Sequence, residues 1–303
     1  MRIVIVTGTE PTHQHFCAEL GRRFSIERIL HPQPPPKKTS AFRKLQDRLK
    51  VYGPTLVILH YLASIESPIS GWRPDRQRRR IDQEYFSGAA SRFAALADRC
   101  IAVRDVNGPE TVQMIRELNP DVTICLGGPI YRKAFIQASR LVLNYHSGLS
   151  PIYNGAETIP FAFANGHPHL CGGTLMVMNE LVDGGDILGH YLPEITASDT
   201  PATLFGKGIT GAAEIVCGFL NHYSTVGQFQ KVAQPAPLFY CRSTERELHH
   251  THSILKHIKT GLCQKHLRKA RINSYWDKPT PEAAERALFA FLNEMLFGVP
   301  SSK

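Results

Sequence analysis

The sequence contains few cysteines, and their spacing matches no cysteine framework. Seven cysteines lie singly along 303 residues, with an odd total and no C-x-x-C pair. This spacing argues against a structural zinc site and against a set of disulfides, and it is typical of reduced thiols in the cytoplasm. We expect Cys125 and Cys171 to be small buried apolar residues rather than reactive groups.

Long apolar runs and targeting signals are also missing. No run approaches the roughly 18 apolar residues of a membrane span. The longest, residues 56–65, is interrupted by His60 and Tyr61. The N-terminal residues MRIVIVTG lead directly into an apolar strand, without the apolar region and cleavage site of a secretory signal. We therefore expect a cytoplasmic protein with no membrane partner.

Acidic residues are outnumbered by basic ones, which gives a formal net charge of +9. Such a charge can indicate a nucleic-acid partner. The basic residues form three clusters: Lys37, Lys38, Arg43, Lys44, Arg48 and Lys50; Arg73, Arg76, Arg78, Arg79 and Arg80; and the segment from Arg242 to Arg271. Runs of this kind are mostly solvated faces, and a phosphate-bearing small substrate needs only one of them. We expect a small-molecule substrate and no nucleic acid.

Metal-ligand spacing is absent from the histidine-rich part of the third cluster. Its histidines are His249, His250, His252, His257 and His266. No cysteines or carboxylates support them at the spacing of a metal site, so the sequence predicts no bound metal.

The chain lacks the G-x-G-x-x-G fingerprint of dinucleotide-binding proteins, although strands and helices alternate as they do there. Only Gly8 follows the first expected strand. Strands are expected at residues 2–7, 25–30, 100–103, 121–126, 141–144, 173–179 and 187–195. Helices are expected at residues 11–23, 108–118, 158–165 and 199–221. This order predicts a Rossmann-like α/β fold with a mostly parallel central sheet.

Composition divides the chain into a main domain, residues 1–225, and a C-terminal extension, residues 226–303. Within the main domain, residues 37–97 are charged and mostly helical by composition, which indicates an insertion between strands. The extension begins with a Pro-rich stretch and ends in an amphipathic helix at residues 281–296. We expect the extension to be small and mainly helical.

The most informative segment runs from Leu141 to Leu188. An apolar strand leads to Asn144 and His146, whose spacing of two puts both side chains on one face of a strand. Asp183 lies in a Gly-rich turn after a second apolar strand. Taken alone, such a His or Asp is usually structural. Together, the amide, imidazole and carboxylate supply what acyl transfer to an amine requires: an oxyanion donor, a proton acceptor and an orienting carboxylate.

The same residues belong to a longer pattern, N-x-H-x-x-x-x-P-x-x-x-G followed by G-G-T and D-G-G-D-I-L. This pattern resembles the folate-dependent formyltransferases, which include glycinamide ribonucleotide transformylase, methionyl-tRNA formyltransferase and the sugar N-formyltransferases. The resemblance is clear from Asp121 to Leu220. It implies a Rossmann-like formyltransferase domain over residues 1–225. It also implies transfer of a formyl group from 10-formyltetrahydrofolate to a primary amine, without a metal.

The resemblance also implies a role for each residue of the pattern. Asn144 would hold the formyl oxygen, His146 would help to move the proton of the attacking amine, and Asp183 would pair with His146. The leaving N10 nitrogen of tetrahydrofolate would take up the proton. The residues that would frame the pterin are Leu126, Gly128, Pro129, Ile130, Tyr131, Asn179, Glu180, Leu181 and Val182.

The chain departs from the family on the acceptor side. Familiar members have S-L-L-P after the His, whereas this chain has S-G-L-S-P, and Gly148 adds backbone freedom there. The residues expected to line the acceptor pocket are Gly8, His13, Ser147, Gly148, Tyr153 and Gly155. The expected acceptor is an amino sugar nucleotide, an amino acid derivative or a peptide amine. A homodimer is compatible with the sequence.

Several alternatives stay open. A methionyl-tRNA formyltransferase would carry a small C-terminal β-barrel, which the helical extension does not resemble, and a glycinamide ribonucleotide transformylase would have a Gly-rich phosphate loop where this chain has Gly8 to His13. A formyltetrahydrofolate hydrolase would have an N-terminal regulatory domain before the MRIVIVTG strand. A nicotinamide-dependent oxidoreductase needs the missing fingerprint. A non-catalytic RNA-binding protein would need none of Asn144, His146 and Asp183.

Overall fold

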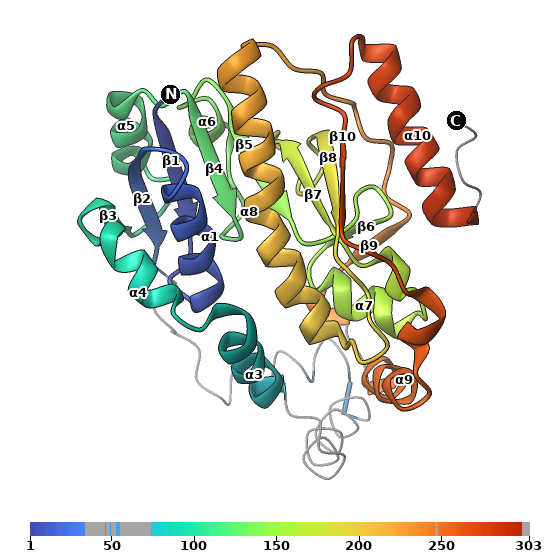
Figure 1. Cartoon of the computed structure of the whole chain (residues 1–303). Helices are drawn as coiled ribbons and strands as arrows, with labels where there is room; N and C mark the ends of the chain where they lie inside the picture. Colours follow the sequence, from blue (N-terminus) through green and yellow to red (C-terminus); the bar gives the residue numbers. More distant parts are fainter. Residues whose placement is uncertain (34–45, 47–48, 50–52, 55–73, 246–247, 299–303) are drawn as a thin grey trace.

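The computed structural model describes residues 1–33, 46, 49, 53–54, 74–245 and 248–298. Its core is an eight-stranded sheet with the strand order β10-β8-β7-β5-β4-β1-β2-β3 (Figure 1). The strands are β1 (Ile3–Thr7), β2 (Ile26–Pro32), β3 (Cys100–Val103), β4 (Val122–Leu126), β5 (Val142–His146), β7 (Gly173–Val177), β8 (Asp186–Leu192) and β10 (Arg271–Ser274). The five strands from β3 to β5 pair in parallel, and β7, β8 and β10 join them by antiparallel pairing. The predicted fold class, an α/β fold with a mostly parallel sheet, is confirmed.

Helices cover both faces of the sheet because its strands are apolar on both faces. In β1, Ile3 and Ile5 pack with α1 and α8 on one face, and Val4 and Val6 pack with α5 and α6 on the other. Figure 1 shows the first pair of helices in front of the sheet and the second pair behind it. The helices are α1 (Pro11–Gly21), α3 (Pro74–Phe86), α4 (Ala89–Phe93), α5 (Pro109–Leu118), α6 (Lys133–Ile136), α7 (Thr158–Ala164), α8 (Pro201–Val226), α9 (Leu248–Lys259) and α10 (Pro281–Phe297).

The structure describes the second half of the predicted insertion. There α3 and α4 form as expected, and Phe86, Ala89 and Leu96 are buried against the sheet. The side chains of Arg79 and Arg80 are exposed. The residues of the first basic cluster, Arg73 and the apolar run 56–65 lie outside the described residues.

Helix α8 is long and apolar enough, by length and composition, to cross a membrane, and among the described helices it is alone in this. However, 67% of its apolar window is buried inside the protein. The helix begins at Pro201, after a Thr200 side chain that accepts a hydrogen bond from the Thr203 amide, and it ends before Gly227, whose φ is 73°. Because α8 packs against α1, α3 and β8, we assign it as a core helix.

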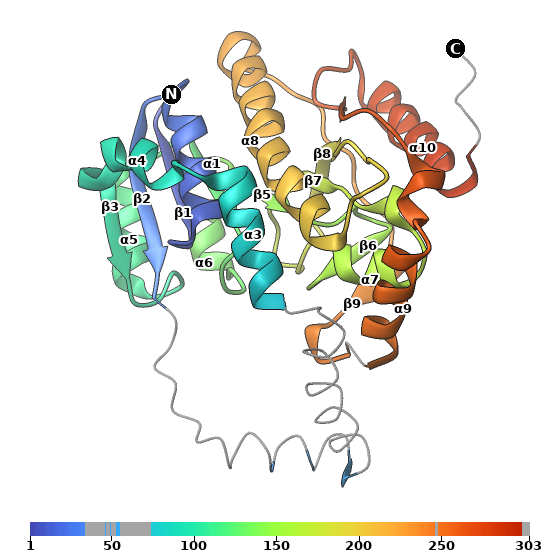
Figure 2. The ribbon, with the colours of Figure 1, turned by 60° about the horizontal axis from the view of Figure 1, so that its bottom comes forward.

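The C-terminal extension is built into the main domain by two strands that the sequence did not predict. Strand β10 extends the central sheet by pairing with β8, and β9 (Phe239–Cys241) pairs in parallel with β6 (Tyr153–Gly155) as a second sheet. Figure 2 shows this small sheet beside α7 and α9. Helices α9 and α10 match the expected helical character.

One residue of the third basic cluster, Arg268, is partly buried and holds the extension in place. The Arg268 guanidinium donates hydrogen bonds to the carbonyls of Pro193 (2.9 Å), His169 (2.5 Å) and Cys171 (2.6 Å). Burial lowers the pKa of Arg268 to about 10. The expectation that the basic residues from Arg242 to Arg271 form a solvated face is therefore wrong for Arg268. Its N–H groups instead bind backbone carbonyls of the main domain, which need hydrogen-bond partners.

Candidate active site

A cleft of about 660 Å³ opens where β1, β4 and β5 end. Parallel strands bring their carboxyl ends to one edge of a sheet, where α/β folds bind ligands. The cleft is lined by residues 12–13, 126–131, 144–147, 155–156, 178–183, 185 and 240–243, together with Met176, Phe205 and Ile209. Asn144, His146 and Asp183, which the sequence singled out, all line it.

The His146 ring lies between two oxygen atoms. Its Nδ1 is 3.3 Å from Asp183 Oδ1, and its Nε2 donates to the Tyr153 carbonyl at 3.2 Å. Both side chains of the pair are largely buried, at 8% exposed for His146 and 14% for Asp183. The turn between β7 and β8 begins beside the first residues of β5, since Val177 pairs with Leu143. It must therefore fold back along β5 to bring Asp183 to His146.

The turn that carries Asp183 is held by residues that the sequence did not reveal. Asp183 has a left-handed backbone, with φ of 52°, and its carbonyl accepts hydrogen bonds from Asn154 Nδ2 (2.9 Å) and Gln234 Nε2 (2.7 Å). Gln234 Nε2 also donates to the Gly185 carbonyl at 2.8 Å. The second carboxylate oxygen, Oδ2, accepts from the Gly155 amide at 3.1 Å. These hydrogen bonds hold the Asp183 carboxylate in an orientation that points Oδ1 at the His146 ring.

The loop after His146 is anchored to the antiparallel strands. Thr174, from the G-G-T motif, donates from Oγ1 to the Gly148 carbonyl (2.7 Å) and accepts there from the Ser150 amide (2.9 Å). On β8, His190 Nε2 donates to the Ser150 carbonyl at 2.7 Å, and its Nδ1 shares a 2.8 Å hydrogen bond with the Tyr275 hydroxyl. Burial lowers the pKa of His190 to about 4, so the ring is neutral at pH 7.

Gly148 is required by a close approach rather than by backbone freedom alone. A Cβ at this position would collide with His146 Nε2 and with the Tyr153 carbonyl. The absence of a side chain therefore lets the loop pack directly over the ring of His146. Gly148 itself does not line the cleft.

The Asn144 amide faces the cleft and is half-buried. Its backbone lies between Cys125 on β4 and Met176 on β7. Among the residues that the structure describes, no hydrogen-bond partner occupies its side chain, so the amide N–H groups are available to a ligand. Cys125 and Cys171 are both buried, as expected, and burial raises the pKa of each thiol to about 12.

The residues predicted for the pterin all line the cleft, from two facing loops. Tyr131 closes the first loop by donating from its hydroxyl to the Gly127 carbonyl at 2.9 Å. Asn179 shapes the second through hydrogen bonds with Leu181 N and Gly184 O, both at 2.9 Å. The loops present apolar tips, with Ile130 67% and Leu181 69% exposed. Apolar side chains on two sides, with backbone polar groups between them, suit a flat heterocycle.

The predicted acceptor residues are only partly brought together. His13, Ser147 and Gly155 line the cleft, whereas Gly8 and Tyr153 do not. The Tyr153 side chain is instead in the core, 1% exposed, with its ring stacked on Phe239 and its hydroxyl hydrogen-bonded by the Asn165 amide. Its backbone carbonyl, rather than its ring, reaches His146.

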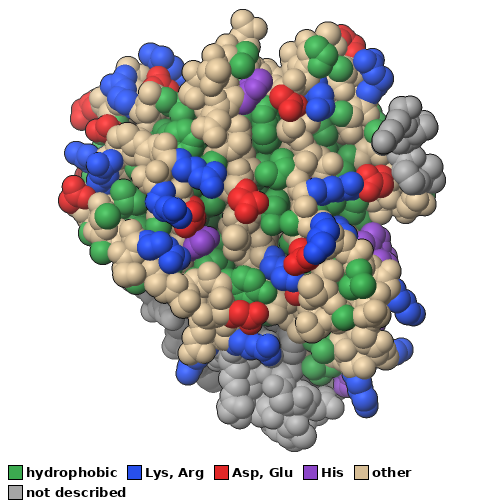
Figure 3. All heavy atoms as spheres, viewed as in Figure 1, with side chains coloured by type: hydrophobic (Ala, Val, Ile, Leu, Met, Phe, Trp, Pro, Cys, Tyr) green, Lys and Arg blue, Asp and Glu red, His purple; other side chains and the backbone are tan. Residues whose placement is uncertain are grey.

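The cleft also has a wall from the C-terminal extension, made of Tyr240, Cys241, Arg242 and Ser243. No local motif marks these residues, and the proline-rich stretch before them was the sole signal of an extended segment. On the face shown in Figure 3, Lys and Arg side chains are interspersed with Asp and Glu rather than gathered in one patch. Among the described residues, no group of His, Cys, Asp and Glu is arranged to hold a metal ion.

This chain is similar to one protein family and to several solved structures. Residues 75–216 match the model of the formyl transferase family. The structure is similar to an N-formyltransferase from Helicobacter canadensis in complex with folinic acid and dTDP-3-aminofucose, with 13% identity and a TM-score of 0.51 over 84% of this chain and 80% of that chain.

Two further structures are similar at lower scores. One is a sugar N-formyltransferase from a Shewanella species, with 14% identity and a TM-score of 0.49 over 84% of this chain and 86% of that one. The other is glycinamide ribonucleotide transformylase 1 from Symbiobacterium toebii, with 13% identity and a TM-score of 0.49 over 78% and 94%. The resemblance that the sequence pattern indicated is confirmed by the family match.

Proposed function

Because residues 75–216 match the model of the formyl transferase family, we propose that this chain moves a formyl group from 10-formyltetrahydrofolate to a primary amine of a small molecule. The observation that carries the proposal is the His146–Asp183 pair at 3.3 Å, in one cleft with the unpaired Asn144 amide. A dinucleotide site would not need these three groups.

In this proposal each residue acts on a defined atom. The Asn144 amide donates to the formyl oxygen as it becomes an oxyanion, because a preorganised donor favours the charge that develops there. The amine nitrogen attacks the formyl carbon, and the amine proton leaves through the His146–Asp183 pair, with His146 Nε2 exchanging its contact to the Tyr153 carbonyl for the amine. The bond from the formyl carbon to N10 breaks, and N10 takes up a proton. The pterin lies between the loops 126–131 and 179–182.

The acceptor is proposed to be a small molecule rather than transfer RNA. The described extension has two helices and two short strands, each paired to the main domain, and it does not form a separate barrel. The name of the Helicobacter canadensis structure includes an amino sugar nucleotide. We therefore favour an amino sugar nucleotide over an amino acid derivative or a peptide amine. The seven free cysteines support a cytoplasmic location.

A thermal-shift titration tests the donor. The protein is heated with 5-formyltetrahydrofolate and, separately, with NADPH. The folate should stabilise the fold by about 2.7 kcal/mol at a hundredfold excess over its dissociation constant, and NADPH should have no effect. Stabilisation by NADPH alone would contradict the proposal and favour the oxidoreductase alternative.

A further inference from the structure

Strand β9 pairs with β6 beside the active site, and its closest approach is at Gly155. Gly155 has a φ of 93°, and the space of its missing Cβ is filled by the Cys241 carbonyl. The Ala156 amide also donates to the Cys241 carbonyl at 2.8 Å, and the Gly155 amide donates to Asp183 Oδ2 at 3.1 Å. The position of β9 is therefore fixed relative to the catalytic carboxylate.

The register of β6 and β9 determines which side chains face the cleft. Phe239 pairs with Tyr153, stacks on its ring with centroids 4.7 Å apart, and does not line the cleft. Tyr240 pairs with Asn154, and paired residues of a parallel ladder point to the same face. Asn154 points to Asp183, since its amide donates to the Asp183 carbonyl. Tyr240 therefore lies on the Asp183 side, where it lines the cleft and is 44% exposed.

A cation lies next to this aromatic ring. The Arg242 guanidinium carbon is 5.7 Å from the centroid of the Tyr240 ring, within the range of a cation–π contact. Arg242 also pairs with Glu245 at 3.2 Å, but its side chain stays 66% exposed and lines the cleft. The two residues thus present a flat aromatic face and a fork of N–H donors on one wall.

These two features fit a ring joined to an anion. An aromatic side chain stacks on any flat heterocycle, and a guanidinium binds phosphate oxygens with paired hydrogen bonds. We infer that Tyr240 and Arg242 form the acceptor subsite, in which Tyr240 stacks on a nucleobase and Arg242 binds the diphosphate of a nucleotide-linked amino sugar. This inference rests on the proposed function, because it assumes that the amine is placed at His146.

Binding of two probes tests the subsite separately from the chemistry. Uridine diphosphate and thymidine diphosphate are titrated by calorimetry into the wild type and into Tyr240→Ala and Arg242→Gln. Each substitution should weaken binding of at least one probe by roughly tenfold or more, the order expected for one base stack or one charge-assisted contact. Tyr240→Phe should bind as the wild type does.

Arg140→Gln is the matched control. Arg140 is 65% exposed and pairs with Asp121 at 3.2 Å, as Arg242 does with Glu245, but it does not line the cleft. It should leave diphosphate binding unchanged, and binding of 5-formyltetrahydrofolate should be unchanged in every variant. If the wild type binds the folate but neither diphosphate, or if Tyr240→Ala and Arg242→Gln bind both diphosphates as the wild type does, the subsite is wrong and the proposed function stands. If the wild type does not bind the folate, the proposed function fails first.

Discussion

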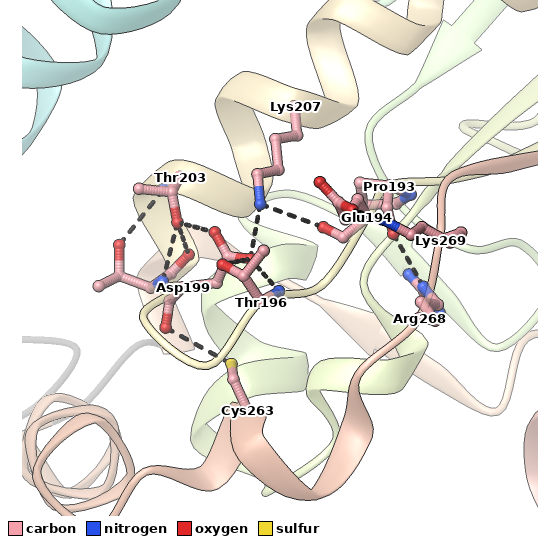
Figure 4. Close-up of polar contacts among 10 residues, drawn as sticks. Pro193, Glu194, Thr196, Asp199, Thr203, Lys207, Cys263, Arg268 and Lys269 are labelled. Atoms are coloured by element: carbon pink, nitrogen blue, oxygen red, sulfur yellow. Dashed lines mark hydrogen bonds and ion pairs between the residues drawn. The ribbon is translucent and has the colours of Figure 1, made fainter.

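Two carboxylates, one before and one after β8, have different surroundings: Asp183 faces the cleft, and Asp199 is buried among hydrogen-bond donors. Before the strand, Asp183 faces the cleft with one oxygen 3.3 Å from the His146 ring. After the strand, Asp199 accepts hydrogen bonds from the Thr196 amide (2.6 Å), the Thr203 hydroxyl (2.7 Å) and Lys207 Nζ (2.7 Å), as Figure 4 shows. Its side chain is 3% exposed.

Asp199 shows how hydrogen bonds to both oxygens change the pKa of a buried carboxylate. Burial raises the pKa of Asp199, but the hydrogen bonds from Lys207, Thr196 and Thr203 outweigh this effect and hold the pKa below its ordinary value. The Cys263 thiol, from the extension, also contacts the Asp199 carbonyl at 3.4 Å. A carboxylate whose oxygens are saturated by buried donors supports the fold. One that shares a cleft with an imidazole is a candidate for a catalytic role.

The largest effect is expected at the structural carboxylate. Asp199→Ala leaves the Lys207 ammonium buried without its partner, which should lower the free energy of unfolding by about 3–5 kcal/mol. Asp186→Ala is the control, because Asp186 pairs with Lys231 at 2.8 Å but is 32% exposed. Loss of that exposed pair should cost about 1 kcal/mol or less. Urea denaturation of both variants measures the difference, and equal losses would contradict the distinction between the two carboxylates.

The next effect is expected on turnover. Asp183→Asn suits the left-handed backbone, which Asn tolerates, but it removes the charge that orients His146. We expect a loss of about a hundredfold or more in kcat, and a similar loss for Asn144→Ala. His146→Ala combined with Asp183→Asn should be little worse than either alone, because the pair acts as a unit. Steady-state kinetics measures these losses.

The outcome at position 183 also distinguishes two candidates. Near-normal turnover of Asp183→Asn would make Asp183 a turn residue, and Asp186, the second aspartate of the D-G-G-D-I-L motif, would become the candidate. The structure disfavours Asp186, because it pairs with Lys231 and does not line the cleft. Melting temperatures should stay close to that of the wild type in the Asp183 and Asn144 variants, since neither change opens the core.

The smallest effect concerns acid. Burial holds the pKa of His190 at about 4 in the folded protein, below the ordinary value of 6.5. The unfolded chain therefore binds more protons between these values, so stability is lost as the pH falls through 6.5 toward 4. This group alone should cost about 2 kcal/mol between pH 7 and pH 5. Urea denaturation of the wild type and of His190→Gln at pH 7 and pH 5 measures the effect. If the variant loses as much free energy of unfolding between the two pH values as the wild type does, the loss comes from other groups.

The sequence predicted the active-site residues that lie close together in the chain, and it missed the contacts between residues far apart in the chain. Asn144 and His146 lie two residues apart on one strand, so the period of a strand places them together. Their catalytic roles remain predictions. Gln234 contacts the Asp183 turn from 51 residues away, and Asn154 contacts Gln234 across 80 residues. Such contacts depend on how the extension packs, which no local pattern records.

Packing of the extension also explains why the sequence did not predict the cleft wall of Tyr240, Cys241, Arg242 and Ser243. The wrong expectation that the Tyr153 side chain would line the pocket came from its position in the loop. Strand β6 turns that ring into the core and leaves Asn154 facing Asp183. The sequence did not predict Tyr240 as a cleft residue, because its position depends on the pairing of β9 with β6. Strands as short as these, without flanking turn residues, carry little signal in sequence.

Transfer of a labelled formyl group is the sharpest test of whether this chain is a formyltransferase that uses Asn144. The protein is incubated with isotopically labelled 10-formyltetrahydrofolate and a mixture of amino sugar nucleotides, free amino sugars and peptides, and the products are analysed by mass spectrometry. We expect the wild type to form a labelled N-formyl amine, and Asn144→Ala to bind the donor but to form about a hundredfold less product. Release of the label as formate alone, or equal product formation by the wild type and Asn144→Ala, would contradict this expectation.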